Sequence, residues 1–315
     1  MSQDPFSAPD QGAFFSPDQP VRRTKDGRPY VWDPSKGKEA PYTRVTTFID
    51  CLEDKTMLAK WGERMALQGV RDDTSVGRRL MAVKPVPTLP SRPSGDEVRA
   101  RNGLLDEEKK ALNGIAADAK EAAGWKRAAD LGTELHRLTE VVDGGGRLAP
   151  ETPGVLAEDV AAYTGAMGRY GLRPVEAEVF VANDELRTAG TFDRVYEWSL
   201  PGREPIRVIG DLKTGRVDYG QGKLAMQLAL YANSQRYDPA RPTERGAVDV
   251  HPHVGLIVHL PVGKQECRVY ALDLAQGWRG VVLAAQVRDW RRETSRGVLN
   301  DLALEVDLAA MLDER

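Results

Sequence analysis

Three strand-like segments in close succession constrain the fold more than any other feature of the sequence. They are rich in β-branched and aromatic residues and span residues 175–181, 188–198 and 206–213. Two turn-forming pairs, Asn183-Asp184 and Pro201-Gly202, separate them. Because short connections of this kind join neighbouring antiparallel strands, the three segments predict an antiparallel meander.

Helix-like segments surround the meander, and further strands follow it. Residues 125–142 and 155–170 precede it, and residues 222–237 have apolar side chains at helical spacing after it. Residues 253–260 and 267–272 are again strand-like. A strand, a crossover helix and a next strand in one sheet form a right-handed parallel connection. The order αβββαβ therefore predicts a mixed sheet partly covered by helices, of the α/β or α+β class.

The remaining segments divide the chain into four parts. Residues 1–40 lack apolar periodicity and are rich in Pro, Gly, Asp, Ser and Lys, which predicts a disordered or extended arm. Residues 41–124 predict a helical region, interrupted near 83–94 by a proline-rich linker that cannot be helical. Residues 125–275 form the predicted core, and residues 276–315 predict C-terminal helices.

Composition excludes several classes of protein. The chain of 315 residues, 41% of them hydrophobic, can bury the core of one large domain or two modest ones. It has neither a long apolar run nor a secretion signal, which predicts a cytoplasmic protein without a membrane partner. Two cysteines, Cys51 and Cys267, cannot by themselves form a disulfide framework or an iron–sulfur cluster. With a net charge of −3, any polyanionic partner would have to bind through local patches or metal ions.

Polar side chains within apolar strands mark a candidate site. Asp211 and Lys213 are two residues apart at the end of the third segment, so both project to one face of the sheet. Asp193 belongs to the second segment, whose strand is expected about 4.8 Å away. Carboxylates are preferred ligands of hard divalent cations, and the Lys213 ammonium can reach an attacking water or a phosphate. These residues predict a metal site.

Two helices add polar residues to this candidate site. His136 and Glu140 are four residues apart and share one helical face before the sheet. An imidazole ligand suggests that Mn²⁺ works at least as well as Mg²⁺. Gln227 and Tyr231 have the same spacing on the crossover helix, where they can hydrogen-bond a phosphate or fix Lys213.

Each of these residues taken alone has an ordinary structural explanation. An Asp-X-Lys tripeptide is usually an edge salt bridge, and a single histidine such as His136 is more often buried and hydrogen-bonded than a ligand. Glu178, on the first strand, is either an additional ligand, a hydrogen-bond acceptor beside the site or the partner of an arginine. It is their combination in a fixed order that favours a functional site.

Two other groups of residues are weaker candidates. His253 and His259 have the same strand parity, but strand spacing separates them by about 20 Å, which argues against a shared metal. Arg288, Arg291 and Arg292 lie on one face of the last helix. They predict either a stripe that grips phosphates or a solvated face, with equal weight.

The motifs GTELH, GTFDRV, GDLKTG and QLALY resemble those of the RecB-like branch of the PD-(D/E)XK nucleases, which includes phage and CRISPR-associated exonucleases. The resemblance implies a restriction-endonuclease-like fold and a metal-dependent phosphodiesterase that acts on DNA. It implies that Mg²⁺ or Mn²⁺ is held by His136, Asp193, Asp211 and the Leu212 carbonyl, with Lys213 catalytic. The candidate catalytic residues are then Asp211, Lys213, Gln227, Tyr231 and Glu178.

The resemblance also implies a biological setting. Cluster-containing members of the branch use four cysteines, so two cysteines predict no iron–sulfur cluster. An exonuclease acting on single-stranded DNA or end-containing duplex is favoured, in recombination, repair or phage replication in a bacterial or phage-infected cell. Because no helicase Walker motif is present, unwinding would need a separate helicase or recombination partner. The alternatives are a catalytically silent DNA-binding or assembly module and a hydrolase of another phosphate ester.

Overall fold

The computed structural model describes residues 20–295, which form two compact units. One unit contains the sheet and consists of the residues up to Glu53 and from Leu138 onward, and the other is helical and spans Asp54–Arg137. The outer parts of the predicted arm and of the predicted C-terminal helices, residues 1–19 and 296–315, lie outside the described residues.

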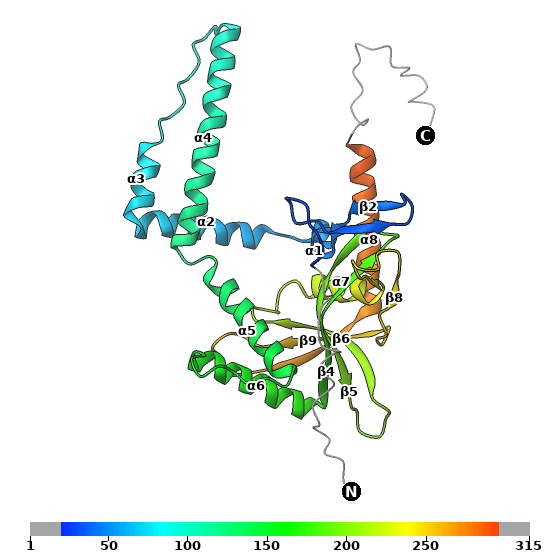
Figure 1. Cartoon of the computed structure of the whole chain (residues 1–315). Helices are drawn as coiled ribbons and strands as arrows, with labels where there is room; N and C mark the ends of the chain where they lie inside the picture. Colours follow the sequence, from blue (N-terminus) through cyan, green and yellow to red (C-terminus); the bar gives the residue numbers. More distant parts are fainter. Residues whose placement is uncertain (1–19, 296–315) are drawn as a thin grey trace. The chain divides into compact units, whose positions relative to one another are not determined.

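A mixed sheet is the centre of the first unit (Figure 1). Its meander consists of β4 (Leu172–Asn183), β5 (Thr188–Trp198) and β6 (Ile206–Lys213), which pair antiparallel in sequence order. Helix α7 (Gln221–Ala232) connects β6 to β9 (Val254–His259), and these two strands pair in parallel. The mixed α/β class and the predicted connection are confirmed.

Shorter strands extend this sheet on both sides. β10 (Arg268–Asp273) pairs antiparallel with β9 at one edge. At the other edge β7 (Gln235–Arg236) pairs with β4, and β8 (Gly246–Ala247) pairs with β7. β3 (Thr43–Arg44) lies parallel to the start of β5. The predicted helix 222–237 is therefore too long, because its last residues leave α7 and pair with β4.

Helices bury apolar side chains against the sheet. α1 (Val45–Ile49), which a 3₁₀ turn at Asp50–Leu52 follows, packs with α7 and α8 (Leu274–Thr294) in one core. This core also takes in Phe192 of β5 and Ile209 of β6. α6 (Gly154–Tyr170) contacts β4 and β10.

Part of the predicted N-terminal arm is an ordered hairpin, which corrects the expectation of a disordered or extended segment. β1 (Tyr30–Asp33) and β2 (Lys38–Pro41) pair antiparallel. Val31 and Tyr42 are fully buried beside Phe180 of β4 and Tyr237. The sequence offered little signal for this hairpin, because the residues that bury it lie far along the chain.

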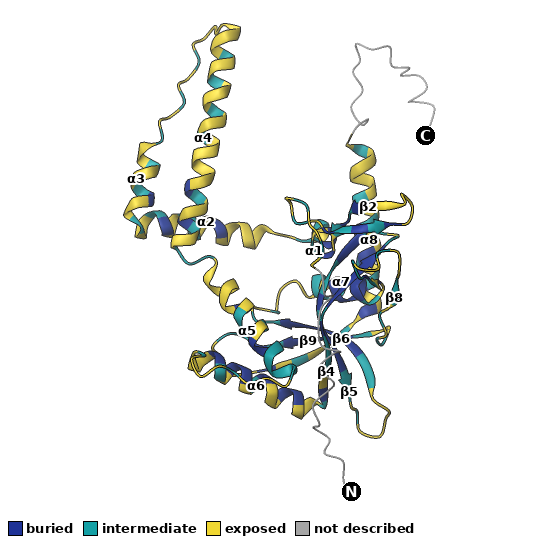
Figure 2. Cartoon of the chain, in the orientation of Figure 1, coloured by how far each residue is buried: buried dark blue, intermediate teal, exposed yellow. Residues whose placement is uncertain are grey.

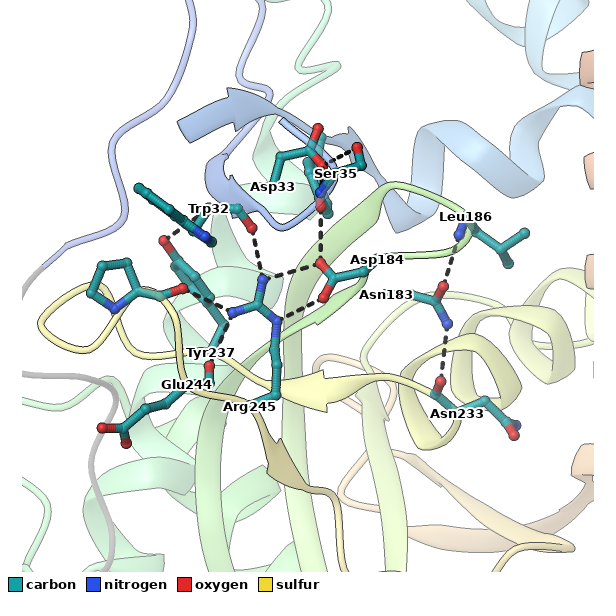
Figure 3. A network of polar contacts seen from close by, with 12 residues as sticks. Trp32, Asp33, Ser35, Asn183, Asp184, Leu186, Asn233, Tyr237, Glu244 and Arg245 are labelled. Carbon is teal, nitrogen blue, oxygen red and sulfur yellow. Dashed lines mark hydrogen bonds and ion pairs between the residues drawn. The ribbon is translucent and has the colours of Figure 1, made fainter. Parts of the chain in front are cut away.

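A polar network holds this hairpin to the rest of the unit (Figure 3). The guanidinium of Arg245 donates hydrogen bonds to both carboxylate oxygens of Asp184, at 3.0 and 3.1 Å, and to the carbonyl of Trp32, at 2.7 Å. The Tyr42 hydroxyl also donates to Asp184, at 2.9 Å. The Trp32 amide donates to the Tyr237 hydroxyl, at 3.2 Å. Arg245 thus links the hairpin to the turn that connects β4 and β5.

The helical unit contains α2 (Thr56–Asp72), α3 (Thr74–Ala82) and α4 (Gly95–Ala122), and most of their surface is exposed (Figure 2). Residues 83–94 are not helical, as the prolines predict, and Ser94 forms a capping box with Glu97 at the start of α4. α5 (Arg127–Asp143) begins in this unit and ends in the sheet unit. The boundaries expected at residues 41 and 125 therefore lie at 54 and 138. None of the described helices has the length and apolar character needed to cross a membrane.

Candidate active site

Asp211 and Lys213 meet at the end of β6. The Asp211 side chain is buried, with 2% of the residue exposed, and the Lys213 Nζ lies 2.5 Å from its Oδ2. Gln227 on α7 donates a hydrogen bond of 3.1 Å from Nε2 to the Asp211 Oδ1. The expected proximity of Asp211 and Lys213 is therefore present. Gln227, expected to bind a phosphate or Lys213, instead bonds to the aspartate.

Asp193 lies beside the same strand end. The ladder between β5 and β6 stops at the pair Arg194 and Gly210, so the Leu212 backbone lies beyond it. The Leu212 amide instead donates a hydrogen bond of 2.9 Å to Asp193 Oδ2. Because the N–H and C=O of one strand residue point to the same side, the Leu212 carbonyl also faces the Asp193 side of β6. Two carboxylates and one carbonyl thus share this edge.

Glu178 has an unusual backbone at the corresponding position of β4. Its φ is +51°, in the left-handed region that few residues other than glycine adopt. The ladder pairs on either side of it, Val179 with Phe192 and Ala177 with Arg194, place Glu178 opposite Asp193. Such strained conformations persist where the surroundings fix them, and they cluster at functional sites.

Burial and like charge raise the pKa values of these carboxyl groups. For Glu178, burial is the largest cause, and the Asp193 and Glu140 carboxylates add to it, which raises its pKa to about 7. Burial and Asp193 also raise the pKa of Asp211, and the nearby Lys213 ammonium opposes them. The site therefore contains more negative charge than its one ammonium neutralises, a situation that a divalent cation relieves.

Arg194 forms a buried support next to Asp193, and the sequence analysis did not identify it. Its side chain is fully buried and donates to Asp143 Oδ2 at 2.7 Å and to the Thr139 hydroxyl at 2.9 Å. The Tyr163 hydroxyl donates to the same carboxylate, at 2.9 Å. An arginine inside the apolar strand GTFDRV was the available signal, since a buried guanidinium requires partners.

Tyr231 packs behind the site. Its ring centroid lies 5.8 Å from that of Phe192, and burial raises the pKa of its phenol well above the ordinary value. A Cβ at Gly190 would lie 2.9 Å from the Tyr231 oxygen, so the glycine of GTFDRV allows β5 and α7 to approach. Tyr231 is thus a neutral packing residue near the carboxylates.

The predicted histidine ligand is a half-buried residue of α5. His136 belongs to the helical unit, whereas Asp193 and Asp211 belong to the sheet unit, so their expected meeting stays a prediction. Among residues 20–295 no three His, Cys, Asp or Glu side chains are grouped as a ready-made metal site. Of the other histidines, His259 binds the Gly215 carbonyl through Nε2, at 2.9 Å.

The residues of the sheet unit nevertheless fit a hard divalent cation. Asp211 Oδ2 is buried and, within the described chain, has no hydrogen bond of ordinary geometry, although Lys213 lies beside it. Asp193 and the Leu212 carbonyl supply further oxygen donors at the same edge. Carboxylate and carbonyl oxygens are the donors that Mg²⁺ and Mn²⁺ prefer.

Comparison with known proteins adds no family assignment. No protein-family model matches the chain, and no curated protein matches it.

Proposed function

We propose that the protein is a Mg²⁺- or Mn²⁺-dependent deoxyribonuclease with a restriction-endonuclease-like core, acting most readily as an exonuclease. The observation that supports this proposal is the pairing of Lys213 with a buried, hydrogen-bonded aspartate beside a second carboxylate. A divalent cation bound by Asp193, Asp211 and the Leu212 carbonyl, with His136 as a further ligand, would supply Lewis acidity for phosphodiester hydrolysis.

The protein residues divide the remaining work. Gln227 fixes Oδ1 of Asp211, so the other oxygen, Oδ2, has a defined direction. With 31% of its side chain exposed, Lys213 reaches from this oxygen toward solvent, where it can orient a water or stabilise negative charge on the phosphate. Glu178, with its pKa near 7, can accept or release a proton at neutral pH.

A catalytically silent DNA-binding module is the second candidate. Such a module has no chemical need for a buried aspartate together with a lysine, and burying this pair costs free energy that packing alone does not require. The strained backbone of Glu178 next to the same acids also favours a catalytic role.

Incubation of DNA with the purified protein tests the proposal. End-labelled linear DNA and closed circular DNA are each incubated with Mn²⁺, Mg²⁺, Ca²⁺ or EDTA. We expect cleavage of linear DNA with Mn²⁺ or Mg²⁺, none with EDTA, and none for Asp211→Ala. Asp249→Ala, which removes an 81% exposed carboxylate, is the control and should cleave normally. Retarded but intact DNA under all metals would instead support the silent module.

A further inference from the structure

A second candidate site lies at the other end of β5, where α8 passes the turn between β4 and β5. A groove of about 490 Å³ opens there. Four arginines line it, and two acids partly offset them: Arg187, Arg288, Arg291, Arg292, Glu185 and Asp289. The lining therefore has a positive balance in a protein whose net charge is −3.

The four arginines differ in how they are held. Arg288 lies 5.0 Å above the Phe48 ring, and Arg187 lies 5.0 Å above the Tyr42 ring and pairs with Asp33. These aromatic faces hold both guanidinium groups in place. Arg292 pairs with Asp289 on the same helix. Arg291 is exposed, and among the described residues no hydrogen bond or ion pair engages it. The groove thus combines fixed arginines with one whose donors are available.

Backbone contacts fix the opposite wall of the groove. The Thr43 amide donates to the Arg187 carbonyl, at 2.8 Å, and the Leu186 amide donates to the Asn183 side chain, at 2.9 Å (Figure 3). Asn183 in turn donates to the Asn233 carbonyl, at 3.0 Å. The turn is therefore held to both β3 and the end of α7, so its arginine keeps a defined place.

Strand β5 sets the separation between this groove and the carboxylates. Arg187 immediately precedes the strand and Asp193 lies six positions later, which corresponds to roughly 20 Å at about 3.3 Å per residue. One strand of B-form DNA places a phosphate about every 3.4 Å along the helix axis, so roughly six phosphates span this separation.

We infer that the arginine groove binds the phosphodiester backbone of a DNA strand whose scissile bond lies at the carboxylate site. This inference rests on the proposed function and adds where the substrate is held: several nucleotides from the bond that is cleaved. Guanidinium groups match phosphate oxygens in both charge and geometry, and binding through the backbone requires no particular base sequence.

Fluorescence anisotropy with labelled DNA tests the groove without any need for cleavage. A twelve-nucleotide oligothymidylate is titrated in EDTA at several salt concentrations, with the full chain, Arg291→Glu and the double variant Arg291→Ala/Arg292→Ala. We expect weaker binding for both, and a slope of log affinity against log salt that is lower by about 2 for the double variant. Arg279→Glu changes an exposed arginine at the start of α8 and should bind as the parent does.

The length of the substrate separates the groove from the chemistry. A four-nucleotide oligothymidylate is too short to reach both places, so its hydrolysis with Mn²⁺ should be equal for the parent and Arg291→Glu, while that of the twelve-nucleotide DNA falls. Equal losses on both lengths, or unchanged anisotropy, would overturn the groove. Binding of a twelve-residue polyglutamate in preference to DNA would also overturn it, in favour of an acidic protein partner. A chain that binds DNA through the groove but hydrolyses neither oligonucleotide would contradict only the proposed function.

Discussion

Gln227 donates a hydrogen bond to one oxygen of Asp211, while Lys213 lies against the other, so each carboxylate oxygen has a different neighbour. Helix α7 thereby fixes the direction of a side chain on β6. The pairing combines a helix residue and a strand residue 16 positions apart.

Removing the Gln227 amide should therefore weaken metal binding. In Gln227→Ala the Asp211 carboxylate loses its orienting donor, and losses of such supporting contacts typically cost about 10- to 100-fold in metal affinity. Mn²⁺ titration by calorimetry measures the change. Gln221→Ala, at the exposed first residue of the same helix, is the control. Equal Mn²⁺ affinity in Gln227→Ala and the parent would show that this hydrogen bond does not orient a ligand.

Replacing Lys213 should separate turnover from metal binding. Lys213→Ala removes a group that orients water or stabilises charge, and we expect a rate about 10² to 10⁴ lower, with Mn²⁺ still bound. Lys223→Ala is the matched control, because Lys223 also lies 2.5 Å from an aspartate, Asp50, with 30% of its side chain exposed. Single-turnover cleavage rates for the two variants give the comparison. A Lys213→Ala protein as fast as the Lys223→Ala control would remove Lys213 from the mechanism.

The raised carboxyl pKa values predict how stability depends on pH without metal. A carboxyl whose folded pKa lies above its unfolded pKa binds protons more tightly in the folded state, so stability falls as pH rises between the two values. For Glu178 this window extends from about 4.5 to about 7, with a slope of up to about 1.4 kcal/mol per pH unit.

Urea unfolding in EDTA at pH 5, 6, 7 and 8 measures this dependence. We expect the free energy of unfolding to be highest near pH 5 and the slope to be smaller in Glu178→Gln. Added Mn²⁺ should stabilise the protein chiefly near pH 8, because deprotonated carboxylates bind the ion. A free energy of unfolding that increases from pH 5 to pH 7 without metal would contradict the raised pKa values.

Gly210 should tolerate no side chain where Tyr196 crosses β6. A Cβ at this position would lie 2.4 Å from Cε2 and 2.7 Å from Cδ2 of the Tyr196 ring. Gly210→Ala should therefore destabilise the protein by about 1 to 3 kcal/mol, as overpacking does. Thermal unfolding measures the effect, with Gly215→Ala as control because its Cβ would contact nothing within 4 Å. If the cost comes from the ring, Tyr196→Ala should reduce the penalty of adding Gly210→Ala.

Arg245 should control the attachment of the N-terminal hairpin. Its loss leaves the Asp184 carboxylate and the Trp32 carbonyl without their guanidinium donor, which costs about 1 to 3 kcal/mol. In Arg245→Ala we expect faster amide hydrogen exchange across β1 and β2 than in the parent. Arg241→Ala, which removes a guanidinium that is 66% exposed, should leave exchange there unchanged. Equal protection in both variants would show that apolar burial alone holds the hairpin.

The sequence by itself determined the central elements of the fold. Strands β5 and β6 have the predicted bounds, 188–198 and 206–213, because their β-branched runs are strongly periodic and end at clear turns. The parallel connection through α7 followed from the handedness of crossovers, and the shared face of Asp211 and Lys213 followed from the strand period of two.

Only the tertiary structure decided which distant residues meet. Hairpin β1–β2 was missed because Tyr237, which accepts a hydrogen bond from Trp32, lies 205 positions away. The left-handed backbone of Glu178 and the hydrogen bond from Gln227 to Asp211 are likewise absent from any local pattern. Local periodicity fixes how each segment folds, whereas burial, charge and hydrogen bonding depend on neighbours that only the folded chain brings together.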